Sequence, residues 1–213
     1  MRKVRFLNGE YYHIYNRGVE KRDIFIAKEN IERFYQSMQE FNVLDPIGSL
    51  YAASFRKVHP LRNLVPKDSD RLVNFIAFCL NPNHFHFILQ QIEDRGIEKF
   101  MHRMGVGYSN YFNKKYKRSG SLFQGTFKAV HLDSDEYLLH ASAYVNVNYK
   151  VHQISSSFIR SSWKEYNSEN ENAFCEKDVI LNQFKDKNGY REFVKTSLET
   201  SLHRKELEKH LET

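Results

Sequence analysis

The sequence predicts an α+β fold in which a largely antiparallel sheet packs against helices. The first reason is the order of its segments: strand, helix, strand, strand and helix, then a further strand-like arm and a helix. The second reason is the turn signal Asn-Pro-Asn at 81–83, which joins two strand-like runs into a hairpin. This order is closer to a ferredoxin-like or RRM-like sheet packed with helices than to a doubly wound sheet.

The first strand and helix are expected near the N-terminus. Residues 10–18 (EYYHIYNRG) predict a strand that ends in a turn at Gly18. Residues 27–44 carry apolar side chains at helical spacing and stop before Pro46, so they predict a helix. The next expected elements are a strand over 50–58 and a loop over 59–70.

The hairpin consists of two runs with different patterns. Residues 71–80 (RLVNFIAFCL) are almost continuously apolar and predict a buried strand. The second run, HFHFILQ at 84–90, alternates, and side chains at i and i+2 of a strand project from one face. His84 and His86 therefore point together, while the phenylalanines point into a core. The two imidazoles are either metal ligands or polar residues on a solvated face, and the pair alone does not decide between them.

Two helices and a strand-like segment are expected after the hairpin. Residues 96–118 predict a long basic helix, which Gly105 and Gly107 weaken in its middle. A turn and a strand-like segment follow over 119–132. The next helix is expected over 135–150, and its sheet-facing side chains would be Leu138, Ala141 and Val145.

The N-terminus of that helix carries capping residues. Asp133 or Ser134 is expected as its N-cap, and Asp133 with Glu136 resembles a capping box. After Ser155-Ser156-Ser157 the chain changes character. Residues 176–186 and 190–211 predict helices, which we expect to pack on the domain as an appendage without a catalytic role.

One face of the 135–150 helix carries groups with a chemical use. Tyr144 and Asn148 are four residues apart and share a face, with His140 one turn earlier. His84, His86 and Asn148 form an N,N,O donor set for a divalent cation, which can polarise a phosphodiester. Tyr144 is then the covalent nucleophile, and its free pKa of about 10 requires a nearby cation or base. A structural histidine pair and a packed tyrosine are the alternative.

Length and cysteine usage limit the class of protein. A chain of 213 residues predicts one domain, or one domain with an appendage. Cys79 and Cys175 are too few for a disulfide framework, which fits a reducing cytosol. The start, MRKVRFLNGEYY, lacks the apolar run of a signal peptide, and no run is long enough to span a membrane. We expect a cytoplasmic protein.

Positive charge is concentrated in the first part of the chain. Residues 1–150 hold 22 Lys and Arg against 15 Asp and Glu, a net charge of +7, whereas residues 151–213 hold 10 against 11. The same chain has 13 tyrosines and 17 phenylalanines. Basic charge interleaved with aromatic rings suits a partner with phosphates and stacking bases, and a solvated basic surface is the alternative.

Five stretches, taken in order, resemble one family: the HUH single-strand transposases, in particular the single-tyrosine group that includes the REP-associated tyrosine transposases. The stretches are YYHIYNRGVEKRDIF (11–25), LNPNHFHFIL (80–89), YSNYFNKKYKRSGSLFQGTFKA (108–129), YLLHASAYVNVN (137–148) and NGYREFV (188–194). The ordered combination is far more specific than any one piece. Two positions depart from the family pattern, with Tyr149 in place of a proline and Thr126 in place of an arginine.

The resemblance implies a function and a site. The function is that of a metal-dependent single-stranded DNA transposase or endonuclease, which cleaves and rejoins one strand through a 5′-phosphotyrosine intermediate. His84 and His86 would be ligands of Mg²⁺ or Mn²⁺, Tyr144 the nucleophile and Asn148 a third, polar ligand. The partner would be single-stranded, hairpin-bearing DNA, and a homodimer is left open. The expected phosphate contacts are Arg17, Lys114, Lys115, Lys117, Arg118 and Lys128.

The domain division and the rival functions follow from the same pattern. We expect a single-tyrosine transposase (nuclease) domain over 1–150 and a helical C-terminal appendage over 151–213. The first rival is a non-catalytic, domesticated single-stranded nucleic-acid-binding protein on the same fold. The second is a metallohydrolase that uses activated water and forms no covalent adduct.

Overall fold

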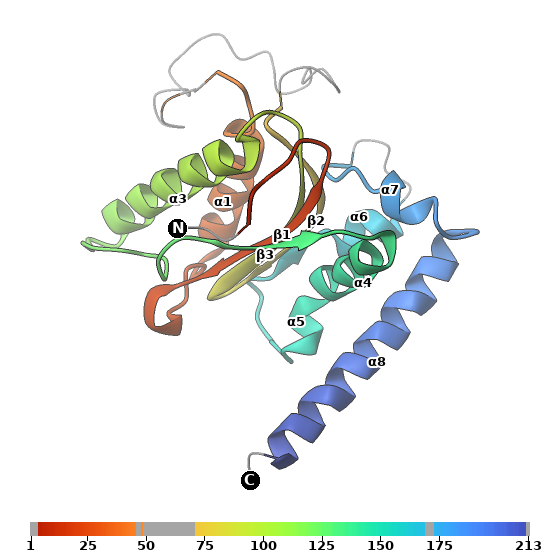
Figure 1. Ribbon diagram of the computed structural model, residues 1–213. Coiled ribbons are helices and arrows are strands. Elements are labelled where there is room, and N and C mark those ends of the chain that lie inside the picture. Colours follow the sequence, from red (N-terminus) through yellow and green to blue (C-terminus); the bar gives the residue numbers. More distant parts are fainter. Residues whose placement is uncertain (1–3, 46–47, 49–70, 169–172, 212–213) are drawn as a thin grey trace.

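The computed structural model describes residues 4–45, 48, 71–168 and 173–211. Among these residues a five-stranded sheet has the order β4-β1-β3-β2-β5, and all its neighbouring strands are antiparallel (Figure 1). The strands are β1 (Tyr11–Arg17), β2 (Val73–Asn81), β3 (His84–Gln91), β4 (Lys128–Leu132) and β5 (Arg160–Ser161). The predicted hairpin is the β2–β3 pair, and the predicted α+β fold is confirmed.

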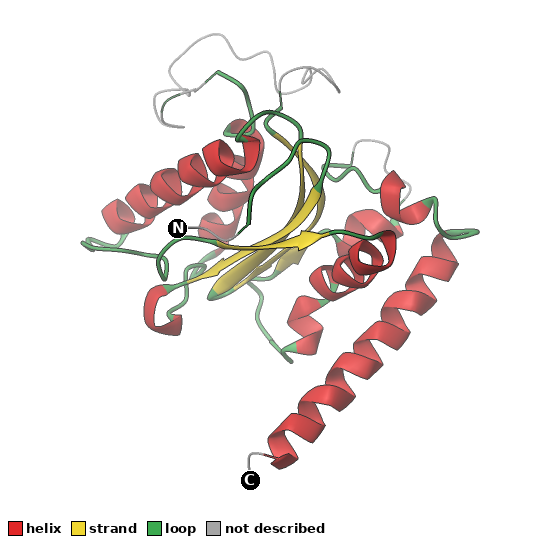
Figure 2. Cartoon of the chain, viewed as in Figure 1, coloured by secondary structure: helices red, strands yellow, loops and turns green. Residues whose placement is uncertain are grey.

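Helices cover both faces of the sheet (Figures 1 and 2). On one face lie α1 (Lys28–Glu40) and α3 (Gly96–Lys115). On the other lie α4 (Asp135–Asn146) and α5 (Asn148–Val151), and α8 (Lys187–Leu211) packs on both. The short elements are η1 (Val19–Lys21), α6 (Trp163–Asn167) and α7 (Asp178–Leu181). Within the described part of the chain, no helix combines the length and apolar character of a membrane span.

Strand β3 is covered on both of its faces. Phe85, Phe87 and Leu89 are buried in the cluster that includes the apolar residues of α1 and α3. Ile88 is buried in the second cluster, with the apolar residues of α4. The predicted alternation is therefore confirmed, but His84 and His86 face a helix-covered layer and not open solvent.

Three predicted helices end earlier than expected. The helix expected over 27–44 stops at Glu40, where Phe41 is the C-cap. The helix expected over 96–118 stops at Lys115. The helix expected over 135–150 is interrupted at Val147, whose φ of −118° and ψ of 21° are not helical.

Other boundaries differ in detail. Ser134 is the N-cap of α4 and accepts a hydrogen bond from the Tyr137 N–H at 3.3 Å, so the predicted capping box of Asp133 and Glu136 is wrong. The strand within 119–132 is limited to β4. The two predicted C-terminal helices are observed as α7, which is shorter than the predicted 176–186, and α8, which begins three residues before the predicted 190–211. The strand expected over 50–58 and the loop expected over 59–70 lie outside the described residues.

The segment after residue 150 is bonded to α4 through one buried tyrosine. Tyr190 of α8 is 1% exposed, and its hydroxyl accepts a hydrogen bond from Asn146 Nδ2 at 2.9 Å. The same hydroxyl lies 3.0 Å from Ser142 Oγ. Ser162 Oγ donates to Asn146 Oδ1 at 2.6 Å. These bonds fix α8 and the 160–163 segment against the helix that carries Tyr144.

The two glycines in the middle of α3 predict opposite effects of alanine. At Gly107 a Cβ would lie 2.7 Å from Cε2 of the buried Phe41 ring, whereas at Gly105 it would meet no described atom within 4 Å. Gly107→Ala is expected to lower the free energy of unfolding by about 1–3 kcal/mol through overpacking. Gly105→Ala is expected to raise it by up to about 1 kcal/mol, because only the helix penalty of glycine is removed. Urea unfolding measures both; stabilisation by both variants would contradict the predicted packing.

Candidate active site

One face of the sheet carries a row of polar side chains beneath α4. His84 and His86 of β3 point there, with their ring centroids 5.2 Å apart. In the neighbouring β1, Tyr15 lies opposite His86 and Arg17 opposite His84. Directly opposite residues of an antiparallel pair project from the same face. The alternation of β1 therefore adds His13 to this row.

Helices α4 and α5 bring two more groups over the row. Tyr144 is half-buried, and its ring lies edge-on to the His86 ring at a centroid distance of 5.8 Å. Asn148 is fully buried, and its Oδ1 lies 3.2 Å from His84 Nε2. The four residues singled out in the sequence, from two distant stretches, thus lie side by side.

The link between Tyr144 and Asn148 is not one continuous helix. Tyr144 is on α4, and Asn148 is the first residue of α5, after the break at Val147. Both side chains still reach the same site, because the Val147 N–H keeps a helical bond to Ala143 O at 3.3 Å. His140 was expected on this face, but it is exposed and packs against Phe193 of α8.

Hydrogen bonds define which nitrogen of His84 carries the proton. His84 Nδ1 lies 2.5 Å from Asn83 Oδ1, which only accepts, so Nδ1 carries the hydrogen. Nε2 of the neutral ring then has a free lone pair, which accepts from Asn81 Nδ2 at 2.9 Å. Asn81 Nδ2 also donates to Asn148 Oδ1 at 2.7 Å. The Asn81 amide therefore donates hydrogen bonds to the two atoms, His84 Nε2 and Asn148 Oδ1, whose lone pairs would bind a cation.

His86 is held by a third imidazole, that of His13. His13 Nε2 lies 2.8 Å from His86 Nδ1, and the two rings stack with their centroids 5.0 Å apart. If His86 Nδ1 donates this bond, its Nε2 keeps the lone pair that a metal needs. If His13 donates, His86 Nε2 carries the hydrogen and cannot ligate. A cation at His86 thus requires His13 as the acceptor.

Burial shifts the pKa values of the site in two directions. It lowers the pKa of His84, and it lowers the pKa of His86 well below the usual value, so both imidazoles are neutral at pH 7. It lowers the pKa of His13 to about 4. For the Tyr144 phenol, burial raises the pKa and the Asn148 side chain partly opposes the rise. The phenol is therefore protonated at neutral pH and needs help to react.

The donor set fits a divalent cation in part. No group of three or more His, Cys, Asp or Glu side chains within the described ranges is placed to hold a metal ion. His84 Nε2 and Asn148 Oδ1, however, are 3.2 Å apart, close to the separation of about 3 Å between two ligands at right angles around a cation. The buried Nδ2 of Asn148 has no hydrogen-bond partner among the described residues, which is rare for a buried polar atom in a folded protein. Two imidazoles and an amide fit an incomplete site that substrate oxygens or water would complete.

Sequence reasoning missed three residues of this site: His13, Asn81 and His152. His13 could have been found, because EYYHIYNRG places it two residues before Tyr15 in a predicted strand. Asn81 was assigned to the turn, although it ends β2 opposite His84. His152 follows α5, and its ring lies 5.6 Å from the His84 ring. No local pattern marks it, because it reaches the site only after the break at Val147.

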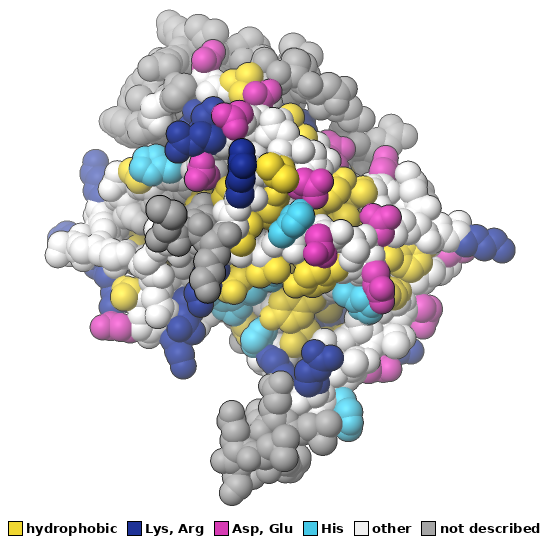
Figure 3. All heavy atoms as spheres, viewed as in Figure 1, with side chains coloured by type: hydrophobic (Ala, Val, Ile, Leu, Met, Phe, Trp, Pro, Cys, Tyr) yellow, Lys and Arg dark blue, Asp and Glu magenta, His cyan; other side chains and the backbone are white. Residues whose placement is uncertain are grey.

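The predicted DNA-contact residues fall into two groups. Arg17 and Lys128 lie on the site face, because Arg17 is opposite His84 and Lys128 is opposite Tyr15. The others lie at or just after the C-terminal end of α3, on the opposite layer: Lys114, Lys115, Lys117 and Arg118. Figure 3 shows Lys and Arg mainly on the α1 and α3 side of the view, with Asp and Glu more frequent over α4 and α8.

The chain is similar to a known protein family and to a solved structure. Residues 64–148 match the model of the family described as "Transposase IS200 like", and this span holds the two histidines, the tyrosine and the asparagine of the site. A solved structure described as "Structure of the REP associates tyrosine transposase bound to a REP hairpin" is similar, with a TM-score of 0.54 and 11% sequence identity. The similarity covers 79% of this chain and 87% of that chain. Among curated protein sequences, no match was found.

The family match and the similar fold both agree with the resemblance to single-tyrosine transposases. The match covers residues 64–148, less than half of the chain, and over this span the resemblance read from the sequence motifs is confirmed.

Proposed function

We propose that the protein is a metal-dependent transposase or endonuclease that cleaves and rejoins one strand of single-stranded DNA. The observation that carries the proposal is the position of the Tyr144 phenol edge-on to His86, beside Asn148 and next to the histidine pair. In this position the phenol can attack a group that the imidazoles and the amide help to hold.

Tyr144 would act by transesterification. Its phenolic oxygen forms a bond to phosphorus, and the bond from phosphorus to the 3′-oxygen of the preceding nucleotide breaks. The phenolic proton passes to water, and the departing oxygen takes up a proton, so the products are a 5′-phosphotyrosine and a free 3′-hydroxyl. Attack by a 3′-hydroxyl reverses the step. Because one phosphoester replaces another, rejoining needs no nucleotide cofactor.

His84, His86 and Asn148 would hold the divalent cation, Mg²⁺ or Mn²⁺. When bound, the cation supplies Lewis-acid polarisation of the phosphodiester. Burial lowers the pKa of both histidines, so that both imidazoles are neutral and each has a lone pair available for a cation. Asn83 and His13 orient the two rings through their Nδ1 atoms.

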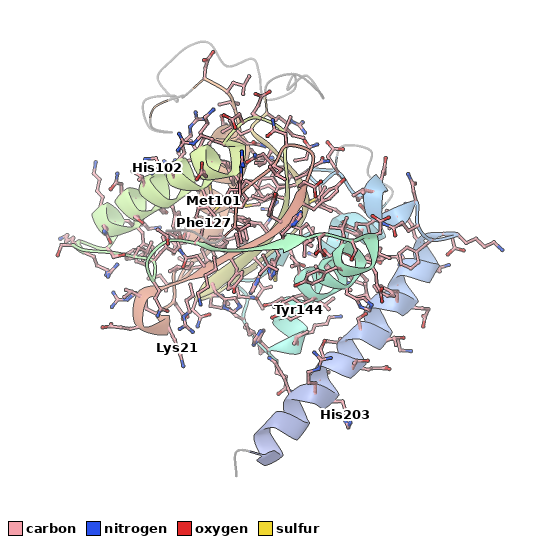
Figure 4. The ribbon with its side chains drawn as sticks, viewed as in Figure 1. Lys21, Met101, His102, Phe127, Tyr144 and His203 are labelled. Carbon is pink, nitrogen blue, oxygen red and sulfur yellow. The ribbon has the colours of Figure 1, made fainter. Side chains whose placement is uncertain are left out.

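The DNA would approach along the row from Lys128 through Tyr15 to His86. Lys128 and Tyr15 also line a groove of about 1320 Å³ between α3 and the 121–129 segment, where Figure 4 labels Met101, His102 and Phe127. Aromatic side chains beside basic ones suit stacked, unpaired bases. The similar solved structure is bound to a REP hairpin, which supports a hairpin-bearing partner for this chain. We propose that the protein acts in the cytoplasm, at the nucleoid, and a homodimer stays a prediction.

The first prediction concerns the cation. His86→Ala should abolish Mn²⁺ binding to the DNA-bound protein. His13→Phe should weaken it by about 10–100-fold, because phenylalanine keeps the volume but cannot accept the His86 Nδ1 hydrogen. His131→Gln is the control, since His131 stacks on Tyr12 at the opposite face of the sheet. Calorimetric titration measures the affinities; an unchanged affinity in His13→Phe or His86→Ala would contradict the ligand assignment.

The second prediction concerns the polymer. Single-stranded DNA should bind more tightly than a blunt duplex, and its affinity should fall linearly with salt on a double-logarithmic plot. Arg17→Gln and Lys128→Gln should each reduce the slope by about 0.7, the value for one phosphate contact on a single strand. Lys195→Gln on the exposed surface of α8 should leave the slope unchanged. Tighter binding to the duplex, or equal slopes in all variants, would argue against this surface.

The third prediction concerns the nucleophile. Tyr144→Phe removes one oxygen and should leave folding and DNA affinity nearly unchanged, yet eliminate the covalent protein–DNA adduct. Tyr137→Phe is the matched control, because Tyr137 is on the same helix but exposed. Denaturing electrophoresis with labelled single strands and Mn²⁺ shows the adduct. Cleavage without an adduct would indicate a metallohydrolase, and binding without cleavage would indicate a domesticated DNA-binding protein.

A further inference from the structure

The hydroxyl of Tyr144 makes a contact that the proposed chemistry does not use. The Tyr144 hydroxyl lies 3.5 Å from His152 Nε2, at the C-cap of α5. On the other side of the same ring, His152 Nδ1 lies 2.9 Å from Lys205 Nζ of α8. Lys205 Nζ also donates to Val151 O at 3.2 Å. A chain of polar contacts therefore runs from α8 to the phenolic oxygen.

The chemistry of lysine determines which atom donates in each of these hydrogen bonds. An ammonium group has three donors and no acceptor, so His152 Nδ1 must accept from Lys205. The neutral imidazole then carries its hydrogen on Nε2, which faces the phenolic oxygen. His152 is therefore a donor to Tyr144 and cannot take its proton. The distance of 3.5 Å is long, as is usual for catalytic contacts before substrate binds.

The position of Lys205 is set by the way α8 is anchored. Tyr190, near the start of α8, is buried and bonded to Ser142 and Asn146 of α4. Lys205 lies 15 residues later, about 22 Å along a helix. Over this length α8 contacts α4 and then α5 (Figure 1), and Figure 4 shows His203 on the stretch of α8 beyond Tyr144. The anchor and the Lys205 contact are thus two ends of one rigid element.

We propose that α8 is part of the active site, with Lys205 and His152 as positioning residues for the Tyr144 nucleophile. Lys205 fixes the Nε2–H form of His152, and that N–H holds the phenolic oxygen toward the histidine pair. The inference rests on the proposed function, and it gives the C-terminal helix a role in the reaction. During rejoining, the bond from phosphorus to the phenolic oxygen breaks and the bond to the 3′-oxygen forms. The 3′-hydroxyl proton passes to water. His152 donates a hydrogen bond to the departing phenolate, which then takes up a proton from water.

The test uses three variants of α8 in the full chain. Lys205→Met keeps the length of the side chain and removes the donor, whereas Lys205→Arg retains a donor. Arg204→Met, at an exposed neighbour on the same helix, is the matched control. Lys205→Met is expected to slow adduct formation about tenfold with unchanged single-strand affinity, the loss expected for one hydrogen bond. Lys205→Arg should restore most of the rate. Equal rates in Lys205→Met and Arg204→Met would overturn the proposal.

A second readout does not depend on catalysis. Nitrogen-15 NMR of the histidine rings, without metal or DNA, should show His152 as the Nε2–H form in the unmodified chain and in Arg204→Met. Lys205→Met should shift His152 toward the Nδ1–H form. An Nδ1–H ring in the unmodified chain, or no change in Lys205→Met, would overturn the proposal. If the unmodified chain forms no adduct at all, the proposed function fails while this measurement still decides the role of Lys205.

Discussion

The register of β3 between β1 and β2 is the constraint on which the candidate site depends. Side chains alternate along a strand, so a slip of one residue would exchange the histidines of β3 for its phenylalanines. The register is fixed by burial on the opposite face, where Phe85 and Phe87 are 2% and 0% exposed. Moving two phenyl rings out of that core would cost several kcal/mol, at about 1.5–3 kcal/mol for each ring. The core thus holds His84 and His86 in place without touching the site.

The same register aligns the groups that orient the histidines. The pairing of β1 with β3 places Tyr15 beside His86, and two residues earlier His13 reaches His86 Nδ1. The pairing of β2 with β3 places Asn81 beside His84, where its amide contacts both His84 and Asn148. Each candidate ligand therefore has a partner from a neighbouring strand. Burial keeps this polar group neutral, because charged imidazoles would lose their hydration without an acid to pair with.

Tyrosine side chains connect the C-terminal segment with the rest of the protein. The hydroxyl of Tyr166 donates to Ile76 O of β2, and the hydroxyl of Tyr190 is bonded to α4. Both phenols are buried, so their hydroxyls need partners inside the fold. The helix that carries Tyr144 is consequently held between the sheet and α8. The division between a domain over 1–150 and an appendage over 151–213 remains a prediction, and the two parts share buried hydrogen bonds.

The sequence by itself determined the strands and helices that a periodic pattern of apolar residues within the segment predicts. Alternation in HFHFILQ predicted the faces of β3, and helical spacing predicted α1 and α3, because side-chain direction in a strand or helix depends only on residue number. Motif resemblance selected His84, His86, Tyr144 and Asn148, which the structure brings together. Only the tertiary structure decided the break at Val147 and the approach of His152 and Lys205 to Tyr144. These features depend on packing between segments up to 61 residues apart (Tyr144 to Lys205), and no local pattern of residues records such contacts.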